Sequence, residues 1–443
     1  MNLLATGRIS RLLWDYSLPA VVGMLVMSLY NVIDRIFIGQ GVGTEAIAGL
    51  AITFPVMNIA AALGVLIGAG AAARTSIFMG AGDRDRASLV LGNSLTLIII
   101  NATVYISLMW IFIDDILIAF GASDASLPYA HDFMTFIMPG MLIMNIGFSL
   151  TNVMRASGYP IKAMLSMMIG AGANLILAPI FIFALGLGIK GAAIATDLAM
   201  SLVTIYTITH FCRPSHNLHF RRGSFRLRRS IVLDIIGIGA APSLVNAASC
   251  FINVIMNKTL YLHGGDNAVA AAGIFVTFTS LICMVVVGIC QGMQPIVGYN
   301  YGAGRLDRLK RAYWTAVLWA TCVVAAGCAI GLLFPDLIAR AFTSDAALIA
   351  TTASGFRIAM LCFVVVGFQI VSTTFFQSIG KVGQSIFLSL TRQVLFLIPL
   401  LLILPRMYQL QGIWSSFPIS DLIATLVAAA MIYRQLCIID KKV

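Results

Sequence analysis

Residues 16–38 read YSLPAVVGMLVMSLYNVIDRIFI, a run long enough to cross a lipid bilayer as one helix. Asp34 lies near the end of this run. An ionisable side chain inside a membrane is costly, so such a residue is treated as functional by default. The letters Asn31-Val-Ile return as Asn253-Val-Ile in the second half of the chain, where Met256 replaces the acid. The acid therefore belongs to the first copy of this short motif.

The composition predicts that nearly the whole chain lies in lipid. Of its 443 residues, 60% are hydrophobic and 10% are charged, whereas about 25% of the residues of a typical soluble domain are charged. The net charge of +11 is carried by basic residues between the apolar runs, where they act as topology signals. The expected partner is therefore the lipid bilayer, and nucleic acid is not expected.

Apolar runs of about 20 residues predict twelve membrane-spanning helices. An even number places both ends of the chain on one side, and most of the basic residues fall in the segments on that side. Both termini are therefore predicted in the cytoplasm, with the chain in the cytoplasmic (inner) membrane. The opposite segments hold only Arg35, Lys190, Lys258, Arg340 and Arg406. The spans are expected at 13–37, 47–72, 88–113, 128–154, 160–184, 190–212, 232–260, 267–297, 311–334, 348–375, 383–405 and 410–436.

An internal repeat divides the chain. The segment AGLAITF at 48–54 matches AGIFVTF at 272–278, and the GAG at 80–82 matches the GAG at 302–304. Six spans separate equivalent points, so the two halves have the same orientation, as in one known plan of secondary transporters. We predict an all-α integral membrane fold with twelve transmembrane helices in two pseudo-symmetric six-helix bundles. The expected parts are a first lobe at 1–212, a basic cytoplasmic linker at 213–229 and a second lobe at 230–443.

Four polar side chains are expected at one depth in the first bundle. Asp34 lies about one turn from the outer end of the first span, and Asn174 about ten residues from the outer end of the fifth. Thr196 and Asp197 lie about two turns below the same surface in the sixth span, given a rise of about 1.5 Å per residue. Two carboxylates, an amide oxygen and a hydroxyl suit a sodium ion or a proton. Taken singly, Asn174 and Thr196 are better explained by an ordinary hydrogen bond between helices, whereas the two acids at a similar depth favour an ion site.

The surface between the two bundles is the expected substrate cavity. Methionine side chains are adaptable and aromatic faces attract organic cations, which suits a promiscuous pocket. In the second bundle Asp421, Arg392 and Arg357 lie at membrane depth. Pairing with one another would avoid lone buried charges, and direct contact with a substrate is the alternative. The residues expected to line the cavity are Tyr30, Asn31, Met57, Asn145, Phe148, Met256, Gln291, Gln369 and Arg392.

Several motifs, in this order, resemble the multidrug and toxin extrusion (MATE) family. They are DRIFIGQ at 34–40, AIAGL at 46–50, TFP at 53–55, RASG at 155–158, NLILAP at 174–179, GAAIAT at 191–196 and Arg392-Gln393 ahead of Pro399. The likeness covers essentially the whole chain and is nearest to the DinF/MepA-like branch. It implies efflux of cationic, amphipathic compounds coupled to inward flow of sodium ions or protons. It also implies that Asp34 is the coupling acid and that Asn174 and Thr196 match the other ligand positions.

One position departs from the family pattern. The family commonly has an acid four residues after the asparagine of the fifth helix, whereas this chain has Ala178. Asp197 is not part of the usual pattern. Our hypothesis is that the second carboxylate has moved from the fifth helix to the sixth.

Two other functions compete with drug efflux. A lipid-linked precursor flippase of the same superfamily would need a strongly cationic cavity, whereas the first bundle is acidic. A membrane enzyme would need a group of catalytic side chains that the five histidines do not form. The glycine-rich loop with lysine that binds ATP is also missing from the sequence. We therefore expect a monomeric transporter with no cofactor besides its coupling ion, H⁺ or Na⁺.

Overall fold

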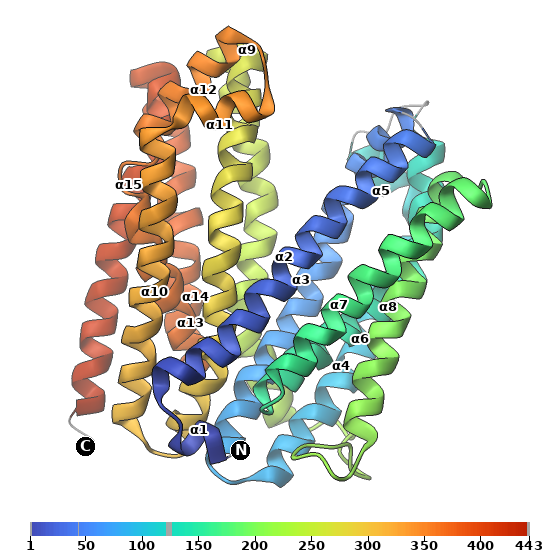
Figure 1. Ribbon diagram of the computed structural model, residues 1–443, viewed down its shortest axis with the longest axis vertical. Coiled ribbons are helices and arrows are strands. Elements are labelled where there is room, and N and C mark those ends of the chain that lie inside the picture. Colours follow the sequence, from blue (N-terminus) through green and yellow to red (C-terminus); the bar gives the residue numbers. More distant parts are fainter. Residues whose placement is uncertain (1, 43, 121–125, 441–443) are drawn as a thin grey trace.

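The computed structural model describes residues 2–42, 44–120 and 126–440. Parts of the predicted lobes at 1, 43, 121–125 and 441–443 lie outside the described residues. The first half of the chain runs along one arm of Figure 1. Its helices are α1 (Asn2–Thr6), α2 (Ile9–Gly41), α3 (Thr44–Gly80), α4 (Arg84–Ile111), α5 (Ile113–Ala119), α6 (Leu127–Ala156), α7 (Pro160–Pro179), the π-helical turn η1 (Ile180–Ala184) and α8 (Gly188–Cys212).

The second half begins with the longest helix of the described chain. Its elements are α9 (Arg229–Gly302), α10 (Leu306–Leu333), α11 (Pro335–Phe342), α12 (Ala346–Ala359), the 3-10 turn η2 (Phe363–Val365), α13 (Val366–Ser378), α14 (Val382–Leu390), the π-helical turn η3 (Thr391–Leu397) and α15 (Ile398–Asp440). We call α2 to α8 the N-bundle and α9 to α15 the C-bundle.

The number of membrane crossings follows from helix length. In the described residues nine helical segments are long and apolar enough to span a bilayer, or ten when α12 and α13, which meet at 57°, count as one. Two of these segments have 74 and 59 residues, which correspond to lengths of about 110 and 90 Å at a rise of about 1.5 Å per residue. The hydrocarbon core of a bilayer is only about 30 Å thick. Non-helical backbone at Gly265 (φ 64°) and Gln409 (φ 49°) breaks each into two crossings. The described chain therefore makes twelve crossings, as the sequence predicts.

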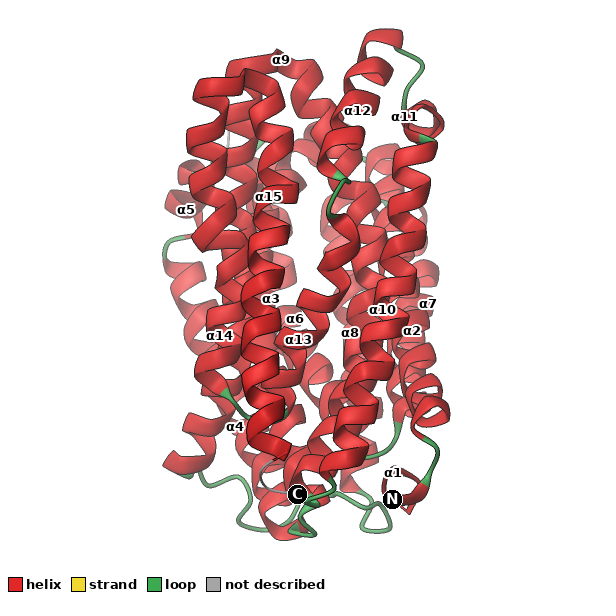
Figure 2. Cartoon of the chain, turned by 90° about the vertical axis from the view of Figure 1, so that its left-hand side faces the viewer, coloured by secondary structure: helices red, strands yellow, loops and turns green. Residues whose placement is uncertain are grey.

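The two bundles meet at one end and diverge at the other. Figure 1 shows them parting toward the end opposite the termini, and Figure 2 shows both chain ends at the bottom of the molecule. At the end that carries the termini, backbones of α3 and α9 touch through glycines. A Cβ added at Gly239 would overlap the carbonyl oxygen of Leu66, and one at Gly302 would overlap that of Ile77. Helices approach this closely only where a side chain is missing.

Helix α2 links the two cores. Its first turns, with Leu12, Leu13 and Tyr16, belong to the same hydrophobic cluster as the core of the C-bundle. Its last turn places Ile38 in the core of the N-bundle. Figure 1 shows this helix running obliquely from beside the C-bundle up to the end of the N-bundle. The helix that carries Asp34 therefore contacts both bundles.

Residues 213–229 fold back against α4. Asn93 donates from Nδ2 to the carbonyl oxygens of Ser224 (2.9 Å) and Arg226 (3.0 Å), and its Oδ1 accepts from the Arg228 amide (2.8 Å). Arg221 also forms an ion pair with Asp85. The connector is thus attached to the N-bundle along much of its length.

Candidate ion-coupling and substrate site

The structure joins two of the four predicted ion ligands. Asn174 on α7 donates from Nδ2 to Oγ1 of Thr196 on α8 at 2.9 Å, and that hydroxyl donates to the Ala192 carbonyl at 3.0 Å. Asn174 is 1% exposed, so this amide lies inside the N-bundle. The bond fixes the two side chains at the same height, as the sequence predicts. It is also the interhelical hydrogen bond that the simpler interpretation predicts.

The other two predicted ion ligands, the carboxylates of Asp34 and Asp197, do not take part in this hydrogen bond. Oδ1 of Asp34 on α2 and Oδ1 of Asp197 on α8 are both buried, and neither accepts a hydrogen bond of normal geometry within the described part of the chain, although the Gly140 backbone amide lies beside the Asp197 carboxylate. Neither is bonded to the Asn174–Thr196 pair. A buried carboxylate oxygen without a donor is unfavourable, so it calls for a proton or a cation. Oxygen donors of this kind fit a proton or a hard cation such as Na⁺.

Gly140 makes room for the Asp197 carboxylate. A Cβ added at Gly140 on α6 would overlap Oδ1 and Cγ of Asp197. The carboxylate is therefore pressed against the α6 backbone, where a larger residue would displace it. No sequence signal identifies this contact, because Gly140 follows Pro139 in an ordinary apolar run. In the described residues no group of three or more His, Cys, Asp or Glu side chains forms a metal site.

The predicted cavity residues of the N-bundle differ in their exposure. Asn31 is exposed, and its Nδ2 donates a hydrogen bond to the Met27 carbonyl oxygen of the same helix (2.7 Å). Phe148 is 40% exposed. Tyr30 and Met57 are half-buried. Asn145 is 7% exposed. It lines a small pocket with Gly64 and Tyr105.

Most of the predicted cavity residues of the C-bundle are buried in its interior. Met256 is predicted to face a substrate, but it is 4% exposed and packs within the hydrophobic core of the C-bundle. In this conformation its side chain is therefore not accessible to a substrate. Gln369 is 5% exposed and donates to the Leu388 carbonyl at 3.2 Å. Gln291 is half-buried, and its Oε1 has no partner among the described residues.

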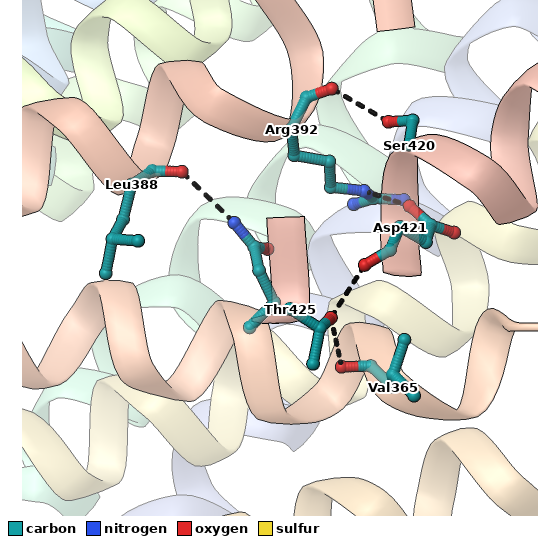
Figure 3. A network of polar contacts seen from close by, with 7 residues as sticks. Val365, Leu388, Arg392, Ser420, Asp421 and Thr425 are labelled. Carbon is teal, nitrogen blue, oxygen red and sulfur yellow. Dashed lines mark hydrogen bonds and ion pairs between the residues drawn. The ribbon is translucent and has the colours of Figure 1, made fainter. Parts of the chain in front are cut away.

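Arg392 forms the buried ion pair that the sequence predicts as one of two possibilities. Its Nε donates to Oδ1 of Asp421 at 2.6 Å, and Asp421 is 3% exposed. Figure 3 shows the surrounding network, in which the Ser420 hydroxyl donates to the Arg392 carbonyl (2.9 Å) and Thr425 to the Asp421 carbonyl (2.7 Å). The Arg392 carbonyl is available because η3 is π-helical, which disturbs the usual backbone bonding.

Arg357 does not join this network. It lies 3.6 Å from Asp336 in an exposed pair, with 64% and 54% of the two side chains accessible. The predicted pairing of both arginines with the buried acid therefore holds for Arg392 alone. Arg357 lies in the last turn of α12, before the 57° bend to α13.

Contacts across the two bundles were not predicted. Arg74 on α3 pairs with Asp234 on α9 at 2.7 Å, with 27% and 39% of the side chains exposed. At the same end, Arg308 donates to the carbonyl oxygens of Leu4 (3.2 Å) and Gly7 (2.7 Å), which ties the N-terminal residues to α10. These bonds and the glycine contacts hold the bundles together at the end that carries the termini. The sequence signal for them is only the position of Arg74 and Asp234 at predicted span ends.

Comparison with known proteins identifies the family. The MatE family model matches residues 19–180 and 241–403, two segments that begin 222 residues apart, close to the offset of the internal repeat. The chain is 25% identical over 419 residues to the multidrug export protein MepA of Staphylococcus aureus, covering 94% of this chain and 92% of that protein. A solved MATE structure in the bent conformation matches with a TM-score of 0.94 and 26% identity, covering 100% of this chain and 98% of the other. An outward-facing multidrug resistance MATE family transporter matches at 0.92 and 26%, covering 99% and 98%. The chain therefore belongs to the MatE family and is a multi-pass membrane protein with the MATE transporter fold.

Proposed function

We propose that this protein exports cationic, amphipathic organic compounds across the bacterial cytoplasmic membrane in exchange for H⁺ or Na⁺. Family membership and the likeness to multidrug export proteins support the class of substrate. The observation that carries ion coupling is the pair of buried carboxylate oxygens without partners, at Asp34 and Asp197. Both lie in the N-bundle.

The coupling step follows from the cost of these charges. When the Asp34 carboxylate is ionised, its buried Oδ1 has no hydrogen-bond partner. Binding of a proton or Na⁺ to this carboxylate therefore lowers the free energy of the protein. Asp34 lies on α2, which contacts both bundles. Neutralisation of Asp34 therefore changes the strength with which α2 packs against the two bundles. Asn174 and Thr196 would hold a cation through oxygen atoms, and Asp197 would supply the second carboxylate.

The orientation of the protein follows from its basic residues. We infer that both termini are cytoplasmic, because the connectors at that end carry most of the lysines and arginines. The bundles touch at that end and diverge at the other (Figure 1), which describes an outward-facing transporter. We propose that a monomer is the working unit, because each chain holds both bundles.

The competing flippase function requires a cationic cavity for a pyrophosphate headgroup. Arg392, the arginine predicted to line that cavity, is neutralised by Asp421. Efflux of cations is therefore the better fit to this chain.

Export can be tested in intact cells. Cells that express the protein are loaded with ethidium and then energised, and loss of fluorescence is followed against cells that carry Asp34→Asn. We expect fast efflux from cells with the wild-type protein and efflux at the background rate with Asp34→Asn. Equal rates in the two strains, with equal amounts of protein in the membrane, would contradict the proposal.

A further inference from the structure

A groove opens beside the first turns of α2, at the end that carries the termini. It has a volume of about 700 Å³ and lies between the start of α2 and the connection from α6 to α7. Sites for small molecules typically measure about 300–1,000 Å³. Its walls include Trp14, Asp15 and Leu18 on α2, and Tyr159, Ile161 and Lys162 around the start of α7.

The apolar wall of the groove faces the surroundings of the protein. Trp14 is 56% exposed, Leu18 43% and Ile161 60%. In a chain that spans the membrane, exposed apolar side chains near helix ends contact lipid, and tryptophan is enriched at the boundary between lipid and water. The Trp14 ring also meets Trp319 of α10 edge to face, with 6.0 Å between centroids, so the C-bundle supports this wall.

Two opposite charges line the same groove. Asp15 is exposed, and within the described part of the chain no ion pair or hydrogen bond engages its carboxylate. Lys162 is half-buried and held in place: its Nζ lies 3.2 Å from Nε2 of His216 and 4.9 Å from the centre of the Tyr159 ring. An ammonium group can only donate, so His216 accepts at Nε2 and donates from Nδ1 to the His210 carbonyl (2.7 Å). The cation is thus positioned before any ligand arrives.

We propose that this groove binds a phospholipid of the inner leaflet whose headgroup carries both a phosphate and a primary ammonium, as in phosphatidylethanolamine. Lys162 donates to the phosphate, and Asp15 accepts from the ammonium group. An acyl chain lies along Trp14, Leu18 and Ile161. An anionic headgroup without an amine would satisfy Lys162 and leave Asp15 facing a negative charge. An organic cation would satisfy Asp15 and meet the fixed charge of Lys162.

Native mass spectrometry of the purified, delipidated full chain tests this site. Phosphatidylethanolamine, phosphatidylcholine and phosphatidylglycerol with identical acyl chains are added separately, and the bound fraction is measured at each concentration. We expect phosphatidylethanolamine to bind most tightly, because choline has no N–H to donate to Asp15. Asp15→Asn should weaken its binding about tenfold, the usual effect of losing one hydrogen bond to a charged group. The same change should leave phosphatidylglycerol binding no weaker, whereas Lys162→Gln should weaken both.

The matched control is Asp85→Asn. Asp85 is an exposed acid on the same end of the N-bundle, but it is paired with Arg221 outside the groove. It should leave the lipid preference unchanged. Equal affinity of the wild-type protein for phosphatidylethanolamine and phosphatidylglycerol would overturn the proposal, as would equal lipid binding by Asp15→Asn and Asp85→Asn. Unfolding temperatures of all variants are compared with wild type, so that a folding defect is not mistaken for a lost lipid.

Discussion

At the scale of single residues, the position of the Asp197 carboxylate depends on a glycine. Gly140→Ala would place a methyl group where Asp197 Oδ1 lies, so the carboxylate must move. We expect the ion concentration for half-maximal efflux to rise about tenfold, the usual effect of disturbing a residue that supports an ion ligand. The control is Gly172→Ala on α7, where an added Cβ meets nothing within 4 Å. Equal ion dependence in both variants would show that the Asp197 carboxylate is not part of the coupling site.

Ala178 lies where the family pattern has an acid on the fifth membrane helix. That residue is fully buried in the N-bundle core, whereas Asp197 Oδ1 is buried without a partner. If the second carboxylate has moved to α8, Asp197→Asn should abolish ion-driven efflux, and Asp197→Asn/Ala178→Asp should restore part of it. Both variants are compared in the same dye-efflux assay at matched protein levels. Full activity of Asp197→Asn would refute the relocation.

At the scale of helices, the buried ion pair between η3 and α15 is predicted to stabilise the C-bundle. Asp421→Asn leaves Arg392 without its counter-charge, which typically costs about 3–5 kcal/mol of unfolding free energy. Asp336→Asn breaks the exposed pair with Arg357 and should cost about 1 kcal/mol or less. The unfolding midpoint in detergent measures both effects. A similar small loss in the two variants would contradict a structural role for the buried pair.

The contact between α3 and α9 leads to a further prediction about helices. Gly239→Ala would drive a methyl group against the Leu66 carbonyl, so the bundles could no longer pack closely at the end that carries the termini. Overpacking of this kind typically costs about 1–3 kcal/mol. Efflux should fall and the unfolding midpoint should drop, while Gly273→Ala on the same helix, with nothing within 4 Å, should leave both near the wild-type value. Wild-type efflux by Gly239→Ala would show that tight closure here is not required.

At the scale of the whole molecule, the sequence predicts the architecture well because lipid imposes it. Each apolar run must form helix to cross the bilayer, so the predicted spans lie along helical segments of the structure, although the tenth, 348–375, crosses the break between α12 and α13. The sequence does not predict the short helices α5 and α11. It does not predict the bend between α12 and α13 either, because the apolar pattern around Leu361 continues without a proline or glycine. Such details depend on packing against neighbours rather than on hydropathy.

The candidate site was less predictable than the fold. Helix rise gives the height of a residue, which is why Asn174 and Thr196 could be placed together, and their hydrogen bond agrees with it. Height does not give rotation about the helix axis. The placement of Met256 in the C-bundle core, and of Asp197 against Gly140, depends on that rotation and on close packing between helices.

We propose that Asp34 on α2, whose Oδ1 is buried without a partner among the described residues, couples export to an ion gradient. Everted membrane vesicles test this coupling, with a sodium gradient and a pH gradient imposed separately while uptake of a fluorescent cation into the vesicles is recorded. We predict that one of the two gradients drives uptake by the wild-type protein and that neither drives uptake by Asp34→Asn. Uptake by Asp34→Asn at the wild-type rate under that gradient would contradict the claim.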